Sequence, residues 1–256
     1  MSGTVEPESV VSTRGLNKYF GGVRALADVS VNIHAGQVLA LVGDNGAGKS
    51  TFTRVISGMD RPDAGQLFYG DELVLKPTAR HAQRYGIEVV PQHLALCDNL
   101  SAAMNVVLGD PPLRWHIGKF GWIDRHAARE LARESVRGVG ARLDDYDSPI
   151  RRMSGGQRQA IAIGRALLRG GRMVIFDEPT AALGVRQREA TLGLIRQVAD
   201  RGLAAVVISH SIDDVFSVAD RIVAFRLGRV VLDSAIEDTD RDAVKFAMEG
   251  LHRGLQ

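Results

Sequence analysis

Hydrophobic and polar positions follow two different periods along the chain, and the changes of period predict its elements. Residues 38–42 and 173–176 are short continuous apolar runs, which are typical of strands buried on both faces of a sheet. After the second run, helical and strand patterns alternate, with helix over about 185–201 and 211–219 and strand over 203–208 and 221–226. A last helix is predicted near 240–249. This order is typical of a mainly parallel sheet covered by helices, an α/β fold.

The N-terminal part has the pattern of antiparallel strands. Residues 10–13 and 27–33 have strand character, and the pair Gly21-Gly22 predicts a turn between them. Residues 1–9 are polar and acidic, so we expect a disordered start and no signal peptide. Further on, the pattern predicts a strand, a helix and a second strand over 66–69, 78–85 and 87–90, the helix being capped by Thr78 and ended by Gly86.

Between residue 93 and about residue 148 the pattern becomes helical and the strand signals stop. We therefore expect an inserted helical subdomain over 93–155, with the α/β core formed by 1–92 and 156–256. A connector over 111–122, rich in proline, glycine and aromatic residues, joins two helical stretches. Its aromatic residues allow two interpretations, a surface for a partner or local packing, and the second is favoured; they are Trp115, Phe120 and Trp122.

The strongest chemical signal is the segment Gly43-Asp44-Asn45-Gly46-Ala47-Gly48-Lys49-Ser50. It fits the phosphate-binding loop pattern and lies between a buried strand and an amphipathic helix, which is the context that this motif requires. The helix is predicted to bury Phe52, Val55, Ile56 and Met59 on one face and to stop at Gly58. An ordinary glycine turn capped by Ser50 is the alternative, and it leaves most of the pattern unexplained.

The loop predicts that the chain binds a nucleoside triphosphate. Glycines let the backbone approach phosphate oxygens, and the N–H groups of the loop and of the helix N-terminus favour negative charge. We expect Lys49 to contact the β- and γ-phosphates, Ser50 to ligate Mg²⁺, and Thr51 to add a phosphate contact.

A second chemical signal is the pair Asp177-Glu178 at the end of the apolar run 173–176. Phosphate-loop enzymes use such acids for metal and water, so we expect Asp177 to hold Mg²⁺ and Glu178 to polarise the attacking water as general base. Acids at strand ends also cap helices, which remains the alternative interpretation.

Composition narrows the class of protein. The net charge of +2 offers no electrostatic basis for binding nucleic acid. A single cysteine, Cys97, excludes a framework of internal disulfides, and its apolar neighbours predict inert packing. No apolar run approaches the length needed to cross a bilayer, so any membrane part is expected in another chain.

Taken together, the motifs make the chain resemble the ATP-binding cassette ATPases over roughly residues 10–235. That family combines a phosphate loop, a glutamine loop, a Ser-Gly-Gly-Gln signature, an acidic strand end and a switch histidine. The matching residues occur here in the same order: Gly43–Thr51, Gln92, Met153-Ser154-Gly155-Gly156-Gln157, Asp177-Glu178 and His210. The resemblance implies a P-loop NTPase core with an N-terminal antiparallel β part, a helical insertion ending in the signature, and ATP and Mg²⁺ as cofactors.

The resemblance also implies a role for each of these positions. Tyr19 would stack on adenine, and Gln92 would touch Mg²⁺ and water and sense a transmembrane partner. His210 would hold the γ-phosphate and help to position Glu178. The signature would contact the γ-phosphate of ATP bound to the opposite subunit, through Ser154 and Gly156 with their neighbours Gly155 and Gln157.

A finer resemblance is to the carbohydrate importers of the ribose, xylose and fructose type, and it concerns Asn45, the run 92–96, the run 180–185 and parts of 209–223. Many of these importers carry two fused cassettes, and this chain resembles the single-cassette members. Most cassettes have aspartate where Gly184 stands here, and that aspartate ties the two ATP sites together across the dimer. Met153 replaces the common leucine, a volume-conserving change that we expect to be harmless.

The resemblance implies an ATPase subunit of an importer, peripheral at the cytoplasmic face of the plasma (inner) membrane. Its implied partners are an integral-membrane permease, a second cassette in a homodimer and, indirectly, a solute-binding protein outside the membrane; nucleic acid is not expected. A cassette for another substrate, or a soluble cassette acting on nucleic acid or ribosomes, remains the alternative. A small-molecule phosphotransferase would have no use for the signature, and Glu178 and His210 disfavour a module that only binds.

Overall fold

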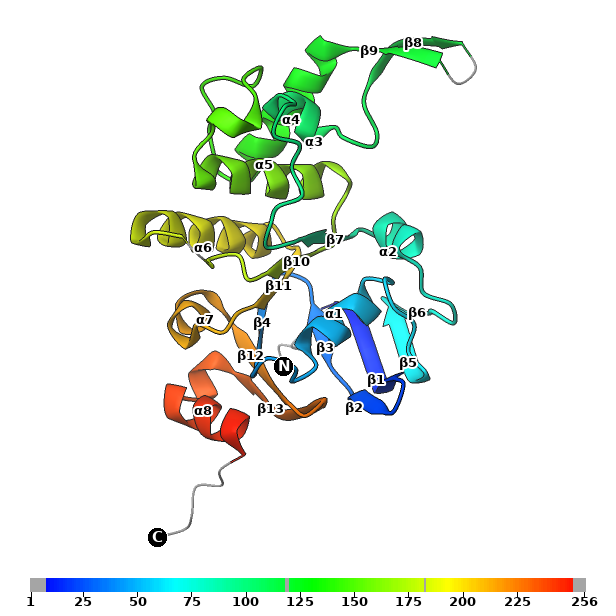
Figure 1. Cartoon of the computed structure of the whole chain (residues 1–256), viewed down its shortest axis with the longest axis vertical. Coiled ribbons are helices and arrows are strands. Elements are labelled where there is room, and N and C mark those ends of the chain that lie inside the picture. The colour runs from blue at the N-terminus through cyan, green and yellow to red at the C-terminus, as the bar shows by residue number, and fades with distance from the viewer. Residues whose placement is uncertain (1–7, 118–119, 182, 251–256) are drawn as a thin grey trace, which may run out of the picture.

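A six-stranded sheet forms the centre of the molecule (Figure 1). The computed structural model describes residues 8–117, 120–181 and 183–250. The strand order is β13-β12-β4-β11-β10-β7, and every neighbouring pair is parallel except β12 and β13. The strands are β4 (Val38–Val42), β7 (Ile87–Val90), β10 (Met173–Asp177), β11 (Ala204–Ile208), β12 (Arg221–Arg226) and β13 (Arg229–Ala235). The predicted α/β core is confirmed, and β13 was not predicted.

The N-terminal part forms a separate antiparallel sheet, as the pattern predicts. The strand predicted over 27–33 is in fact two strands, because β1 pairs with β2 as far as Val29 and with β3 from Asn32 onward. Asp28, with a left-handed φ of 60°, lies at a register shift within the β1–β2 pair. Residues 1–7 of the expected disordered start lie outside the described residues, and Ser9 already belongs to β1. The strands are β1 (Ser9–Phe20), β2 (Val23–Val29), β3 (Asn32–His34), β5 (Ala64–Tyr69) and β6 (Glu72–Leu73).

The helices begin and end close to the predicted caps. The Thr78 hydroxyl accepts a hydrogen bond from His81 N, and Gly86 ends the same helix with φ 98°. Met59 is not on the buried face predicted for it, because the first helix stops before Gly58 and leaves Met59 half exposed. The helices are α1 (Lys49–Ile56), α2 (Ala79–Tyr85), α3 (Ala102–Val106), α4 (Arg125–Gly138), α5 (Gly155–Leu168), α6 (Val185–Asp200), α7 (Ile212–Val218) and α8 (Arg241–Glu249).

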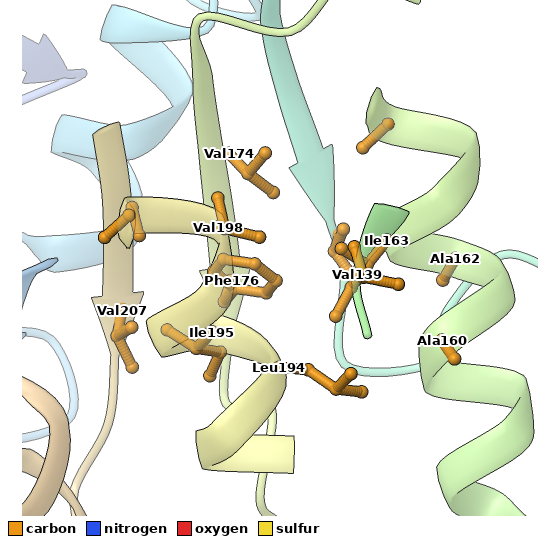
Figure 2. Packing of buried hydrophobic residues seen from close by; sticks show 14 of the residues in the cluster. Val139, Ala160, Ala162, Ile163, Val174, Phe176, Leu194, Ile195, Val198 and Val207 are labelled. Atoms are coloured by element: carbon orange, nitrogen blue, oxygen red, sulfur yellow. The ribbon is translucent and has the colours of Figure 1, made fainter. Parts of the chain in front are cut away.

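The central sheet is buried on both faces, because a hydrophobic cluster covers each side of it. Successive side chains of a strand point to opposite sides and so belong to different clusters. Leu39 and Leu41 of β4 belong to a hydrophobic cluster with α1 and the antiparallel sheet. The alternate residues of β4 belong to a second cluster, which contains buried residues of α3 to α8. Figure 2 shows part of that cluster, with Phe176 of β10 and Val207 of β11 near Ile195 of α6.

The segment inserted between β7 and β10 contains a β-hairpin that the sequence did not predict. Strands β8 (Leu113–Ile117) and β9 (Phe120–Ile123) project from α3 and α4 (Figure 1). Trp115 and Trp122 are cross-strand partners with ring centroids 6.5 Å apart, and they are 50% and 68% exposed. The two rings thus pack locally against each other, as the favoured interpretation has it, but both remain largely exposed. The side chain of Phe120 lies outside the described part of the chain.

The loop after β7 is held by a side chain that binds the backbone of Cys97, and the thiol of Cys97 takes no part in these hydrogen bonds. Cys97 is exposed, so its predicted packing role is wrong. The fully buried Asn105 side chain accepts from Cys97 N at 2.7 Å and donates to Cys97 O at 3.1 Å. Beyond the loop, α5 packs against α3 and α4 of the insertion and also against α6 of the core. Because α5 contacts both parts, its packing does not decide between them, and the domain boundary at 155–156 stays a prediction. Within the described residues, no helix has the length and apolarity needed to cross a membrane.

Candidate functional site

The predicted phosphate loop connects β4 to α1, and its outer glycines are required by their neighbours. Gly43 has φ 141°, and a Cβ there would lie 2.3 Å from Phe225 O. Gly48 has φ 111°, and a Cβ there would lie 2.9 Å from Ala25 O. Only glycine combines these dihedral angles with such close backbone contacts.

The turn between β12 and β13 is hydrogen-bonded to the phosphate loop, a contact that sequence reasoning missed. Gly228 N donates to Ala47 O at 2.9 Å, and Gly228 O accepts from Ala27 N at 2.8 Å. The loop is thus tied to two strands that are distant in sequence. The sequence signal available was Gly228, because tight hairpin turns favour glycine at positions with positive φ. The structure gives positive φ to both Leu227 and Gly228.

Lys49 lies within the loop as the motif predicts. Its side chain is buried, and Nζ donates to Gly43 O at 2.6 Å and to Asp44 O at 3.0 Å. Burial lowers the pKa of the Lys49 ammonium, and the carboxylates of Glu178, Asp44 and Asp177 oppose this shift. The ammonium therefore lies within electrostatic range of the two acids predicted to act on metal and water.

The start of α1 is suited to an anion. Ser50 is exposed and Thr51 half-buried in its first turn, which contains no acidic residue. The free N–H groups and the positive end of the helix dipole therefore meet no negative side chain of this turn.

Asp177 and Glu178 follow one another at the end of β10. Burial raises the pKa of the Asp177 carboxyl, and the charge of Lys49 opposes this shift. Glu178 N donates to Ile208 O at 3.0 Å, and Glu178 has a left-handed φ of 49°. Such a conformation costs about 1–3 kcal/mol in a residue other than glycine, and it is typical of functional sites.

His210 reaches Glu178 from the neighbouring strand. Strands β10 and β11 are parallel and Asp177 is level with Ile208, so both strands end at the same edge of the sheet. His210 Nδ1 lies 2.8 Å from Glu178 Oε2, the distance of a hydrogen bond donated by the protonated ring nitrogen. The structure thus brings together the phosphate loop, the acidic pair and the histidine.

The signature forms a separate surface. Ser154 and Gln157 make a capping box at the start of α5, in which Gln157 N donates to Ser154 Oγ and Ser154 N donates to Gln157 Oε1. Together with Gly156 they line a hollow of about 550 Å³ against α6. Asp44–Ala47 line another hollow of about 290 Å³, formed with 225–227 and the end of α8. Among the described residues, these two hollows have no residue in common.

The other two predicted positions are accessible. Gln92 is exposed two residues after β7. Tyr19 lies near the end of β1 and is 45% exposed, while its backbone N donates to Asp63 Oδ2 at 2.6 Å. Their contacts with adenine, metal and water stay predictions.

The residues present fit Mg²⁺ held together with a nucleotide. Within the described residues, no three or more His, Cys, Asp or Glu side chains are placed to hold a metal ion by themselves. Ser50 and Asp177 offer oxygen ligands, and Mg²⁺ is usually bound by one or two carboxylates together with substrate phosphates.

Asp214 of α7 is the buried polar residue near the site that sequence reasoning missed. It is 3% exposed, whereas the preceding Asp213 is exposed. The available signal was helical periodicity, because Asp214 and the buried Val218 are four residues apart and share one face.

Comparisons with known proteins agree on one family. A family model described as ABC transporter matches residues 26–181. The arabinose import ATP-binding protein AraG of Chromohalobacter salexigens is 38% identical over 95% of this chain and 48% of its own length. The fructose import ATP-binding protein FrcA of Rhizobium meliloti is 41% identical over 93% of this chain and 94% of its own length. The chain spans about half the length of the arabinose and ribose import relatives that it matches.

Solved structures share the fold. The dimeric ATP-binding cassette MJ0796, in a post-hydrolysis state bound to ADP and phosphate, is 25% identical with a TM-score of 0.71. The similarity covers 88% of this chain and 98% of that one. The antiparallel sheet, the parallel core and the inserted helices therefore follow a known arrangement.

Proposed function

This chain belongs to the ABC transporter family, and we propose that it binds and hydrolyses ATP to power uptake of a monosaccharide through a separate membrane permease. The observation that carries ATP hydrolysis is the Glu178–His210 contact beside the buried Lys49. Sugar uptake is supported by the names of relatives that align over nearly the whole chain.

In this proposal each residue at the edge of the sheet where β4, β10 and β11 end has one role. Lys49 binds the β- and γ-phosphates together with the N–H groups of the loop, and Tyr19 stacks on adenine. Glu178 accepts a proton from the attacking water, and His210 orients the Glu178 carboxylate. Ser50, Asp177 and Gln92 would hold Mg²⁺, which when bound neutralises charge on the phosphates.

The signature serves a second cassette. Because Ser154, Gly156 and Gln157 line a hollow that does not include the phosphate loop of their own chain, we propose that they contact ATP held by the partner. Ser154 and Gln157 belong to the N-terminus of α5, so the positive end of that helix dipole lies at this surface. We expect it to attract the phosphate of the partner's ATP. Two identical chains would then bury two ATP molecules in a symmetric dimer.

The inserted subdomain and the Gln92 loop would form the surface for the permease. The chain would thus work as a peripheral subunit at the cytoplasmic face of the plasma membrane, and it would meet a sugar-binding protein only through the permease. The near-zero net charge gives no support to a nucleic-acid partner.

The test is reconstitution with a candidate permease, chosen as the membrane protein that co-purifies with the chain. In vesicles that contain permease and cassette, we expect ATP-dependent uptake of a labelled monosaccharide and ATPase activity stimulated by the matching binding protein. Uptake without ATP, or ATPase activity that no monosaccharide with its binding protein changes, would contradict the proposal.

Replacing Lys49 should weaken nucleotide binding as well as turnover. A Lys49→Ala chain loses the buried cation at the phosphates, and a hydrogen bond to a charged group is worth enough to weaken ATP binding roughly 10- to 100-fold. Titration with a fluorescent ATP analogue measures the change. Lys76→Ala, at an exposed lysine, is the matched control and should bind as the parent does. Unchanged affinity of Lys49→Ala would mean that the loop binds phosphate in another way.

Docking of the permease should be visible in the intrinsic fluorescence. The sequence contains two tryptophans, and both lie exposed on the β8–β9 hairpin of the inserted subdomain. We expect the emission maximum to shift to shorter wavelength, and acrylamide quenching to fall, when the detergent-solubilised permease with its tryptophans replaced by phenylalanine is added. Unchanged emission in a complex that co-elutes on size-exclusion chromatography would remove the hairpin from the docking surface.

A further inference from the structure

A buried carboxylate connects the chain segments that follow Glu178 and His210. Thr180 Oγ1 donates to Asp214 Oδ2 at 2.7 Å, and Arg188 Nε donates to the other oxygen, Oδ1. The Asp214 side chain is 4% exposed. Both of its oxygens are therefore satisfied by residues of other elements, Thr180 after β10 and Arg188 on α6.

The same network holds the residue after His210. The second terminal nitrogen of Arg188 donates to Ser211 Oγ at 2.9 Å, and Asp214 N donates to that hydroxyl at 3.4 Å. Ser211 N in turn donates to Ser209 Oγ at 3.0 Å. The turn that carries His210 is thus tied through Ser211 to Arg188, the partner of the buried carboxylate, and to the backbone N of Asp214.

Glu178 and His210 depend on these segments for their placement. Glu178 adopts a left-handed conformation. Two residues further along the same segment, Thr180 binds Asp214 of α7. The His210 side chain is 73% exposed, so packing constrains it little. Its bond to Glu178 Oε2 requires that both backbone segments keep their relative position.

We propose that Asp214 is a positioning residue: through Thr180 on one side and through Arg188 and Ser211 on the other, it holds Glu178 and His210 in register for hydrolysis. The inference rests on the proposed function, because it assigns Asp214 a part in the same reaction. Asp214 touches neither nucleotide nor water in this account and acts only through the two segments.

The network also reaches the turn that contains Gly184. Gly184 is the N-cap residue of α6 without a side-chain cap, and its carbonyl accepts from Arg188 N at 2.9 Å. Leu183 N donates to Thr180 O at 3.3 Å. The turn before α6 is therefore joined to Thr180 and Arg188 by local backbone hydrogen bonds.

The test uses variants of the full chain with small changes in shape. Thr180→Val removes the hydroxyl that donates to Asp214, Thr180→Ser keeps it, and Asp214→Asn removes the charge. We expect Thr180→Val and Asp214→Asn to lower kcat about 10- to 100-fold, as misplacement of reacting groups by an ångström does. The KM for ATP should stay within about threefold, because the phosphate loop is untouched. Thr180→Ser should restore most of the activity.

A matched control separates positioning from general destabilisation. Arg196 lies on the same helix α6 and pairs with Asp220, which also accepts from Val38 N. Arg196→Met breaks an ion pair at the start of β4, the end of that strand opposite the phosphate loop. We expect it to lower the melting temperature without changing kcat at a temperature where the chain is folded. A kcat loss in Arg196→Met equal to that in Asp214→Asn would overturn the inference.

Coupling to the general base gives a second readout. In single-turnover experiments, Asp214→Asn should slow hydrolysis strongly in the parent but less than about twofold in a Glu178→Gln chain, because the two changes remove the same function. Equal effects in both backgrounds would contradict positioning through Glu178. If the parent chain hydrolyses no ATP, the proposed function fails. If Glu178→Gln hydrolyses ATP normally, the role of Glu178 as general base fails. If only the Thr180 and Asp214 variants are normal, this inference alone fails.

Discussion

A Glu178→Gln chain should bind ATP normally and hydrolyse it roughly 10²–10⁴-fold more slowly than the parent. Glu178 lies at the end of β10 with His210 Nδ1 at 2.8 Å, and its field acts on the ammonium of Lys49. The amide of glutamine keeps the shape of the carboxylate but cannot accept a proton from water. Phosphate release under single-turnover conditions measures the loss.

The variant should also accumulate in the ATP-bound form. Because the step that would destroy ATP is blocked, ATP bound to the chain should outlast repeated washing. Glu237→Gln, at an exposed glutamate following β13, makes the same chemical change outside the site and should hydrolyse as the parent does. ATPase activity of Glu178→Gln within a few-fold of the parent would remove Glu178 from the role of base.

The second large effect is expected on association between chains. In the Glu178→Gln background, addition of ATP should produce a dimer, and Ser154→Arg should abolish it. The signature lines a hollow apart from the phosphate loop, so a composite site needs the partner's ATP against Ser154. An arginine there introduces bulk and also removes the hydroxyl that caps α5. Removing one charge-assisted contact from each of two sites should weaken association by roughly 100-fold or more.

Light scattering with and without ATP measures this association. Leu75→Arg adds the same charge at a residue that is 82% exposed on the antiparallel part, and it should leave the dimer intact. Association is a more direct observable than activity, because it reports the contact between chains without requiring hydrolysis. A stable ATP-dependent dimer of Glu178→Gln with Ser154→Arg would show that the signature is outside the interface.

Mixed dimers extend the same prediction. A Lys49→Ala chain and a Ser154→Arg chain should each be nearly inactive alone. Their heterodimer has one site with both changes and one with neither, so the mixture should recover ATPase activity from at most one intact site. Recovery would support two sites that act independently. If activity is not recovered, hydrolysis requires both sites of the dimer to be intact.

Local patterns in the sequence determined the elements that depend on local interactions. The continuous apolar run at β4 predicted a strand buried on both faces, and the glycines after it predicted the phosphate loop. Thr78 and Gly86 predicted the ends of α2, because capping involves residues within a single turn of helix. The order of strands and helices likewise predicted the parallel core.

Exposure was decided by the tertiary structure. Trp115, Trp122 and Cys97 lie in apolar or aromatic runs, and such runs are equally compatible with a buried segment and with a projecting hairpin or loop. Strand β13 was missed because its pairing with β12 depends on a turn at Leu227-Gly228 that also packs under the phosphate loop.

The catalytic contacts depend on the order of strands in the sheet. The sequence pattern identified Glu178, and the family resemblance implied that His210 helps to position it; the adjacency of β10 and β11 places the two side chains 2.8 Å apart. Sequence reasoning missed Asp214, because its bonds to Thr180 and Arg188 require three elements to meet. A sequence pattern records which residues share a face of one element; the packing of that face against others decides which side chains touch.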